Sequence, residues 1–141
     1  MSPLKSSIWP DAPELAIPDL PTLLCDSDTL WLCYATAHDR RYAIIKFLDL
    51  IDHRLAPIND EGLDQHPYAR AGLKHYEFNE LTGTPETIKW VVLKARHWVI
   101  TFKDNTLDVV AEGAQVVATG LSADNATAAL LAYLQNQSPS C

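Results

Sequence analysis

The strongest constraint on the fold is a strand–turn–strand pattern over residues 96–112. Apolar and polar residues alternate on both sides of Asp104-Asn105, and both residue types tolerate the positive φ of a two-residue hairpin turn. With this turn, His97 faces Glu112 on the solvent side of the hairpin, as a surface pair. The residues predicted on the core side are Trp98, Ile100, Phe102, Leu107, Val109 and Ala111. The separation of the two sides predicts an antiparallel pair with one face in the core.

Other apolar runs extend this hairpin into a sheet. Residues 29–37 and 42–50 are rich in strand-forming residues and are separated by four polar residues, as in a hairpin. Residues 73–80 alternate like a half-buried strand. The short connections, together with a turn expected at Gly113, exclude parallel crossovers. The sequence therefore predicts an α+β fold with a mainly antiparallel sheet of five or six strands.

Three segments carry helix signals. A proline and a glycine lie at the two ends of a short helix predicted over 67–71, and Thr84-Pro85 begins a helix predicted over 85–94. A C-terminal helix is expected after Ser122, which can cap it. Its apolar residues recur at helical spacing, so we expect it to cover one face of the sheet. These residues are Ala126, Ala129, Leu130, Tyr133 and Leu134.

The chain divides into three segments. Residues 1–22 hold five of the nine prolines, which exclude a helix or a central strand, yet they also include large apolar residues such as Trp9 and Leu15. We interpret them as an extended arm that lies on the domain or on a neighbouring subunit. Residues 23–136 form a single α+β domain, because a chain of this length can bury one core. Residues 137–141 are interpreted as a frayed tail.

Composition and charge exclude several classes of protein. The chain is 48% hydrophobic and 21% charged, which is typical of a globular protein. No apolar run approaches the ~20 residues of a membrane span, and the first residues lack the apolar region of a secretory signal, so we expect a cytoplasmic protein with no membrane partner. Eighteen acidic residues against 11 basic ones, with no basic stripe, argue against nucleic-acid binding. Three cysteines without CxxC spacing predict neither a disulfide nor a zinc site.

The polar loop over residues 57–68 is the first candidate site. Asn59-Asp60-Glu61 and His66 place carboxylates and an imidazole within eight residues, a set that can bind a ligand or move a proton. The alternative is turn and cap chemistry. Asp104 and Thr106 join such a site only if this loop folds over the hairpin turn. No metal site and no cofactor is predicted.

His97 is a separate case. In the predicted register it lies seven residues from Asp104, about 23 Å at the strand rise of about 3.3 Å per residue. General-base catalysis needs hydrogen-bond contact or one bridging water, so these two residues cannot act together. Whether His97 is functional or a surface pair with Glu112 stays open at this point.

Several of these motifs occur together in one known pattern. They are Pro57, Asn59-Asp60-Glu61-Gly62-Leu63, His66-Pro67, Gly72-Leu73, Tyr76, Arg96-His97, Phe102-x-Asp104-x-Thr106 and Ala111. Over residues 42–112 the chain resembles a family of uncharacterised bacterial proteins. The resemblance implies no reaction, but it raises interest in the residues that the motifs contain. The chain departs from the family in two places, since Lys103 stands where a histidine is expected and Leu107-Asp108 where Phe-Glu is expected.

Two functions remain open at the level of sequence. The leading hypothesis is a non-catalytic cytoplasmic module that self-associates, most simply as a homodimer, or binds another protein, because the arm and four tryptophans are typical of interfaces. The alternative is a protein, including an enzyme, that binds a small molecule or metal between the 57–68 loop and the 104–106 turn. We lean toward no enzymatic activity. The ligand-binding residues of the alternative are Asn59, Asp60, Glu61, His66, Asp104 and Thr106.

Overall fold

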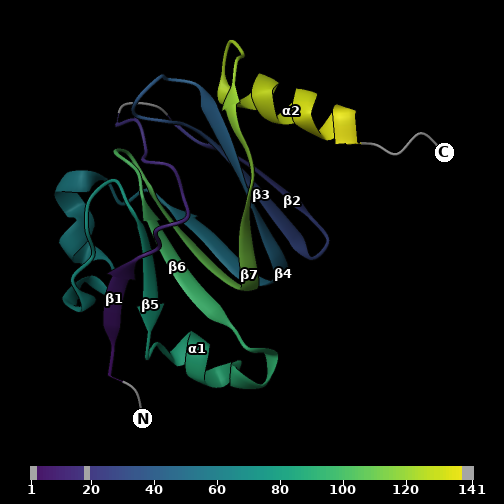
Figure 1. Ribbon diagram of the computed structural model, residues 1–141. Helices are drawn as coiled ribbons and strands as arrows, with labels where there is room; N and C mark the ends of the chain where they lie inside the picture. The colour runs from purple at the N-terminus through teal and green to yellow at the C-terminus, as the bar shows by residue number, and fades with distance from the viewer. Residues whose placement is uncertain (1–2, 18–19, 138–141) are drawn as a thin grey trace.

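The structure, a computed structural model, describes residues 3–17 and 20–137. Their strands form one antiparallel sheet of seven strands in the order β1-β5-β6-β7-β4-β3-β2 (Figure 1). The strands are β1 (Lys5–Ile8), β2 (Thr22–Asp26), β3 (Thr29–Ala35), β4 (Tyr42–Ala56), β5 (Phe78–Thr82), β6 (Arg96–Thr101) and β7 (Thr106–Leu121). The antiparallel α+β class is confirmed, while the predicted number of five or six strands is too low. Residues 138–141 of the expected tail, with Cys141, lie outside the described residues, as do residues 1–2 and 18–19 of the arm.

The two extra strands, β1 and β2, come from the beginning of the chain. β1 pairs with β5 at one edge of the sheet, and β2 pairs with β3 at the other. Prolines around them are compatible with edge positions, where one side of the strand needs no hydrogen-bonded partner. The segment before the domain is therefore part of the sheet.

The β6–β7 hairpin keeps its predicted faces but not its predicted register. Thr101 pairs with Thr106, so the loop spans the four residues 102–105, and every pair is shifted by two residues from the prediction. The shift occurs because Phe102 leaves the ladder and is buried in the core, with its N–H donating to Asn105 O at 3.0 Å. Because two residues are one strand period, each side chain stays on its expected face.

Two further strand predictions are corrected. The strand expected over 73–80 begins only at Phe78, because Tyr76 has φ +56° and the Asn79 side chain holds a turn by accepting from the Lys74 N–H at 2.9 Å. No turn occurs at Gly113. β7 runs through that residue and pairs with β4 along most of its length.

The helices are shorter than expected. They are the 3-10 helices η1 (Asp60–Gln65), η2 (Ala69–Ala71) and η3 (Val91–Leu93) and the α-helices α1 (Pro85–Lys89) and α2 (Ala126–Gln137). The helix predicted over 67–71 is only η2, although Gly72 adopts the left-handed conformation expected after it. The helix predicted over 85–94 ends at Lys89 and continues as η3, where two consecutive β-branched valines disfavour an α-helix. α2 is capped by Asn125, which accepts from the Ala128 N–H at 2.8 Å, and not by Ser122.

One face of the sheet encloses the main core. The rings of Tyr34 on β3 and Phe78 on β5 lie 5.4 Å apart, although four strand-to-strand steps separate these strands. Four steps of about 4.8 Å would separate them by about 19 Å in a flat sheet, so the sheet curls strongly around this core. Residues 9–17 close its open side. Trp9 and Leu15 are 5% and 3% exposed, and the Trp9 N–H donates to Phe78 O at 2.8 Å.

The opposite face has two covers. α2 packs against β3, β2 and β4, with Ala126, Ala129 and Leu130 buried next to Cys33 and Ile44, so the predicted cover of one sheet face is confirmed. The other part of this face, over β6 and β7, is covered by the segment with η1 and η2 and by α1, while Asp52 and Arg54 at the end of β4 stay exposed (Figure 1). Among the described residues, no helix has both the length and the apolar character needed to cross a membrane.

Candidate functional site

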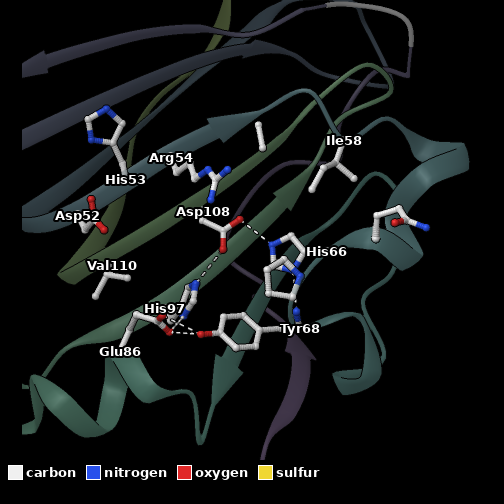
Figure 2. A pocket seen from close by; sticks show the side chains of 13 residues that line it. Asp52, His53, Arg54, Ile58, His66, Tyr68, Glu86, His97, Asp108 and Val110 are labelled. Carbon is white, nitrogen blue, oxygen red and sulfur yellow. Dashed lines mark hydrogen bonds and ion pairs between the residues drawn. The ribbon is translucent and has the colours of Figure 1, made fainter.

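A cavity of about 380 Å³ lies under this second cover (Figure 2). Five parts of the chain line it: the end of β4, the η1–η2 segment, α1, β6 and β7. The lining residues are Asp52, His53, Arg54, Ala56, Ile58, Gln65, His66, Pro67, Tyr68, Glu86, His97, Asp108 and Val110. Polar side chains dominate this list, in contrast to the apolar core on the other face of the same strands.

Asp108 is the centre of the polar cluster. His66 Nε2 lies 2.7 Å from its Oδ1 and His97 Nε2 lies 3.2 Å from its Oδ2, so the carboxylate bridges two imidazoles (Figure 2). Both histidine side chains are 2% exposed and that of Asp108 is 24% exposed. Burial raises the pKa of Asp108, but the hydrogen bonds from His66 and His97 outweigh it and lower the pKa below its usual value. Asp108 is therefore an anion at neutral pH.

The hydrogen bonds of His66 define its tautomer. The backbone N–H of Tyr68 donates to His66 Nδ1 at 3.0 Å, so this nitrogen carries no proton. The proton is on Nε2, which donates to Asp108. His66 is thus a neutral imidazole with both nitrogens in use.

His97 connects the cluster to α1. Its Nδ1 lies 3.2 Å from Thr84 Oγ1 and 3.5 Å from Glu86 Oε2, and its Nε2 contacts Asp108. Thr84 is the N-cap of α1, as predicted, and accepts from the Thr87 N–H. The cap therefore places Thr84 and Glu86 against the face of β6 that carries His97.

Tyr68 and Glu86 complete the wall. The Tyr68 hydroxyl donates to the Glu86 carboxylate, with oxygen–oxygen distances of 2.7 and 2.6 Å to Oε1 and Oε2. Burial and this hydrogen bond to Glu86 raise the pKa of Tyr68, which keeps the phenol protonated. The edge of the Tyr68 ring also packs against His97, with ring centroids 5.5 Å apart.

Strand pairing explains how residues distant in sequence meet. Val99 lies opposite Asp108, and His97 lies opposite Val110, so His97 and Asp108 are diagonal neighbours on one face of the hairpin. The loop that carries His66 is held to the hairpin by two hydrogen bonds. The Asp60 N–H donates to Lys103 O, and the Thr106 hydroxyl donates to Ile58 O, both at 2.8 Å.

The predicted contact between the 57–68 loop and the 104–106 turn therefore exists, but most of the predicted residues do not converge there. Asn59 accepts from the Gly62 N–H as a cap of η1, and Asp60 accepts from the Tyr76 hydroxyl. Glu61 and Asp104 are exposed, and Thr106 is buried with its hydroxyl bonded to the loop. Of the six predicted residues, His66 alone lines the cavity.

The expected surface pair of His97 and Glu112 is wrong. His97 is 1% exposed and opposes Val110, and its partners are Asp108 and the start of α1. The sequence did contain one signal for this cluster. Asp108 is a single carboxylate in the otherwise apolar run 107–111, and such a residue in a buried strand requires a partner. Glu86 and Tyr68 had no comparable signal.

The arrangement limits the chemistry. Each nitrogen of both imidazoles already has a partner, so neither histidine offers a free base to a substrate. Within residues 3–17 and 20–137, no group of three or more His, Cys, Asp or Glu side chains is placed to hold a metal ion. Comparison of the chain with family models, curated proteins and solved structures found no match, so the resemblance to a bacterial family stays a prediction.

Proposed function

We propose that this protein binds a small organic molecule in the cavity next to Asp108. The volume of about 380 Å³ falls within the range of about 300–1,000 Å³ that is usual for small-molecule sites. Five separate parts of the chain contribute to the wall, two of them from the cover, so the cavity is formed by the tertiary fold.

The observation that carries this proposal is the buried, hydrogen-bonded cluster around Asp108. A half-buried carboxylate and two buried imidazoles are unfavourable unless their polar atoms have partners. Apolar side chains would fill the same space without any need for hydrogen-bond partners. The cluster instead keeps a charged carboxylate, 24% exposed, at the wall of a cavity.

The two imidazoles fit a binding role better than a catalytic one. An acid–base or nucleophilic site needs a free base within hydrogen-bond reach of the substrate. Both imidazoles here are held by Asp108 on one nitrogen and by α1 or the Tyr68 backbone on the other. Their hydrogen bonds hold the side chains of the cavity wall in place.

A fragment screen by thermal shift tests the proposal. Ile58→Trp would fill the cavity, and Leu55→Trp is the matched control, since Leu55 is exposed on β4 outside the cavity lining. A ligand that binds only the folded state raises the melting temperature by mass action. We expect fragments that stabilise the wild type and Leu55→Trp but not Ile58→Trp. Fragments that stabilise all three proteins equally, or none of them, would contradict the proposal.

Self-association is the second candidate function, and a different surface supports it. The tryptophans and arm that suggested it are largely used inside the fold, since Trp9 and Trp98 are buried. The segment from α1 to η3, however, exposes consecutive apolar side chains, with Val91 and Val92 66% and 88% exposed. Beside them lies a groove of about 450 Å³, lined in part by Leu81, Ile88 and Val91.

A protrusion next to a groove is self-complementary. In a two-fold dimer, Val92 of each copy would enter the groove of the other, as an isologous contact requires. Sedimentation equilibrium tests this with Val92→Lys and, as control, Leu131→Lys on the exposed side of α2. A dimer in the wild type and in Leu131→Lys, but a monomer in Val92→Lys, is expected. A monomeric wild type would exclude this candidate.

A further inference from the structure

The side chains packed around Asp108 at the inner wall of the cavity, His66, His97 and Tyr68, use their hydrogen-bond donors internally. The Nε2–H groups of His66 and His97 point to Asp108, and the Tyr68 hydroxyl points to Glu86. The remaining nitrogen of each imidazole is also occupied. None of these three side chains therefore has a donor left for a ligand.

Acceptors are left over in the same wall. An ionised carboxylate has about four lone-pair sites. Asp108 uses two of them for the imidazoles, and Glu86 accepts from one phenol and faces His97. Their side chains are 24% and 34% exposed, so the free lone pairs are accessible. The Asp108 and Glu86 carboxylates lie at opposite nitrogens of the His97 ring, one imidazole apart.

The charged side chains that line the cavity are also mainly acidic. Asp52, Glu86 and Asp108 line the cavity against a single guanidinium, that of Arg54, and both Asp52 and Arg54 are exposed. Of the other polar lining side chains, Gln65 is exposed and His53 is half-buried. The lining thus carries an excess of negative charge, although Arg54 lies opposite Asp108 in the β4–β7 pairing.

We infer that the ligand of this cavity is an organic cation rich in N–H donors, namely a primary ammonium, an amidine or a guanidinium. This inference rests on the proposed binding function. Two separated carboxylates suit a planar or elongated cation with several N–H groups, which can donate to both. They do not suit a metal ion, since the described residues place no three metal-ligating side chains together. A carboxylate or phosphate ligand would meet charges of its own sign.

Four probes that each contain a four-carbon chain separate the effect of charge from that of shape. They are n-butylguanidinium, n-butylammonium, n-butanol and butyrate, titrated into the full chain and followed by NMR shifts of backbone amides around the cavity. We expect both cations to bind at least about tenfold more tightly than butyrate and butanol, which corresponds to about 1.4 kcal/mol. Added salt should weaken the cations selectively, because their attraction is partly screened.

Charge-removing variants locate the effect. Glu86→Gln keeps an acceptor for Tyr68 but removes a charge, and we expect about tenfold weaker binding of the cations. Asp52→Asn, at the exposed side, should weaken them less. Glu112→Gln is the control, since Glu112 is exposed and outside the cavity lining, and it should change nothing.

The outcomes separate this inference from the proposed function. Binding of butanol or butyrate as tight as that of the cations, lost in Ile58→Trp, would overturn the cation preference and leave the cavity as a binding site. Cation binding that is unchanged in Glu86→Gln would also overturn the inference. If no probe binds but the fragment screen succeeds, the inference alone fails. If both fail, the proposed function fails with it.

Discussion

Trp98 and His97 are neighbours on β6 and are equally buried, yet they lie in opposite environments. Trp98, 0% exposed, packs against Trp9 and Phe47 in the apolar core. His97, 1% exposed, lies on the other face and bonds to Asp108 and the start of α1. Strand geometry places consecutive side chains on opposite faces. Burial on this sheet therefore arises in two ways, by removal of apolar area from water and by pairing of polar atoms.

The two faces should respond differently to substitution. On the core face, the loss of a side chain leaves an unfilled volume. On the polar face, the loss of one partner leaves others buried without a hydrogen bond. The expected effects therefore depend on volume in one case and on the number of unpaired atoms in the other.

The largest effect is expected from Trp98→Ala. This change removes the ring that contacts both Trp9 and Phe47, and large-to-small changes of this kind cost about 3–5 kcal/mol. Urea denaturation followed by circular dichroism would measure the loss. Trp98→Phe should cost clearly less, because the indole N–H has no hydrogen-bond partner within the described part of the chain. An equal loss in both variants would show that volume is not the controlling quantity on this face.

Asp108→Asn breaks the polar face while preserving its volume. Both imidazoles donate to the carboxylate, and an amide can accept on its oxygen but presents a donor at the other position. We expect a loss of about 1–3 kcal/mol in the free energy of unfolding. The control is Glu112→Gln, an exposed site where the change should stay within about 0.5 kcal/mol. Similar values for the two variants would mean that Asp108 is not part of a paired cluster.

The accuracy of the sequence predictions also differs between the two faces, and the apolar core was predicted better than the polar cluster. The hairpins and the face of each strand depend on alternation of apolar and polar residues, and the core residues Trp98, Ile100 and Val109 were placed correctly. Alternation is unchanged by a two-residue shift, which is why the faces were right while the register was wrong.

The candidate site could not be predicted in the same way. A polar residue in a strand normally faces water, so the pattern placed His97 at the surface. Its burial depends on tertiary contacts with α1 and with Asp108, and on a loop that brings His66 from 42 residues away from Asp108. The only sign of this cluster in the sequence was Asp108, a single carboxylate within an apolar run.

Acid titration tests the polar face separately, because its central partner, Asp108, is a titrating carboxylate. The pKa of Asp108 lies below its unfolded value, so its contribution to stability is full above about pH 4 and is lost as the pH falls below that value. In Asp108→Asn this contribution is absent. We expect the variant to lose stability less steeply below about pH 4 than the wild type, by less than about 1.4 kcal/mol per pH unit. Parallel stability curves for the two proteins, measured in urea at each pH, would contradict this.

The smallest effect is expected from Tyr68→Phe. It removes only the hydroxyl that donates to Glu86, at the accessible side of the cluster, and should cost about 0.5–1.5 kcal/mol. Chemical denaturation would measure it against Tyr42→Phe, whose tyrosine is partly buried near α2. A loss as large as that of Asp108→Asn would place the centre of the cluster at Glu86 and not at Asp108.

The most direct test of the paired polar face is the tautomer of His66, read from its side-chain ¹⁵N NMR shifts across the neutral pH range. The hydrogen bonds predict a neutral ring with the proton on Nε2 and none on Nδ1, and an Nε2–H that exchanges slowly with water because the side chain is 2% exposed. A proton on Nδ1, or fast exchange typical of an exposed imidazole, would contradict the cluster around Asp108.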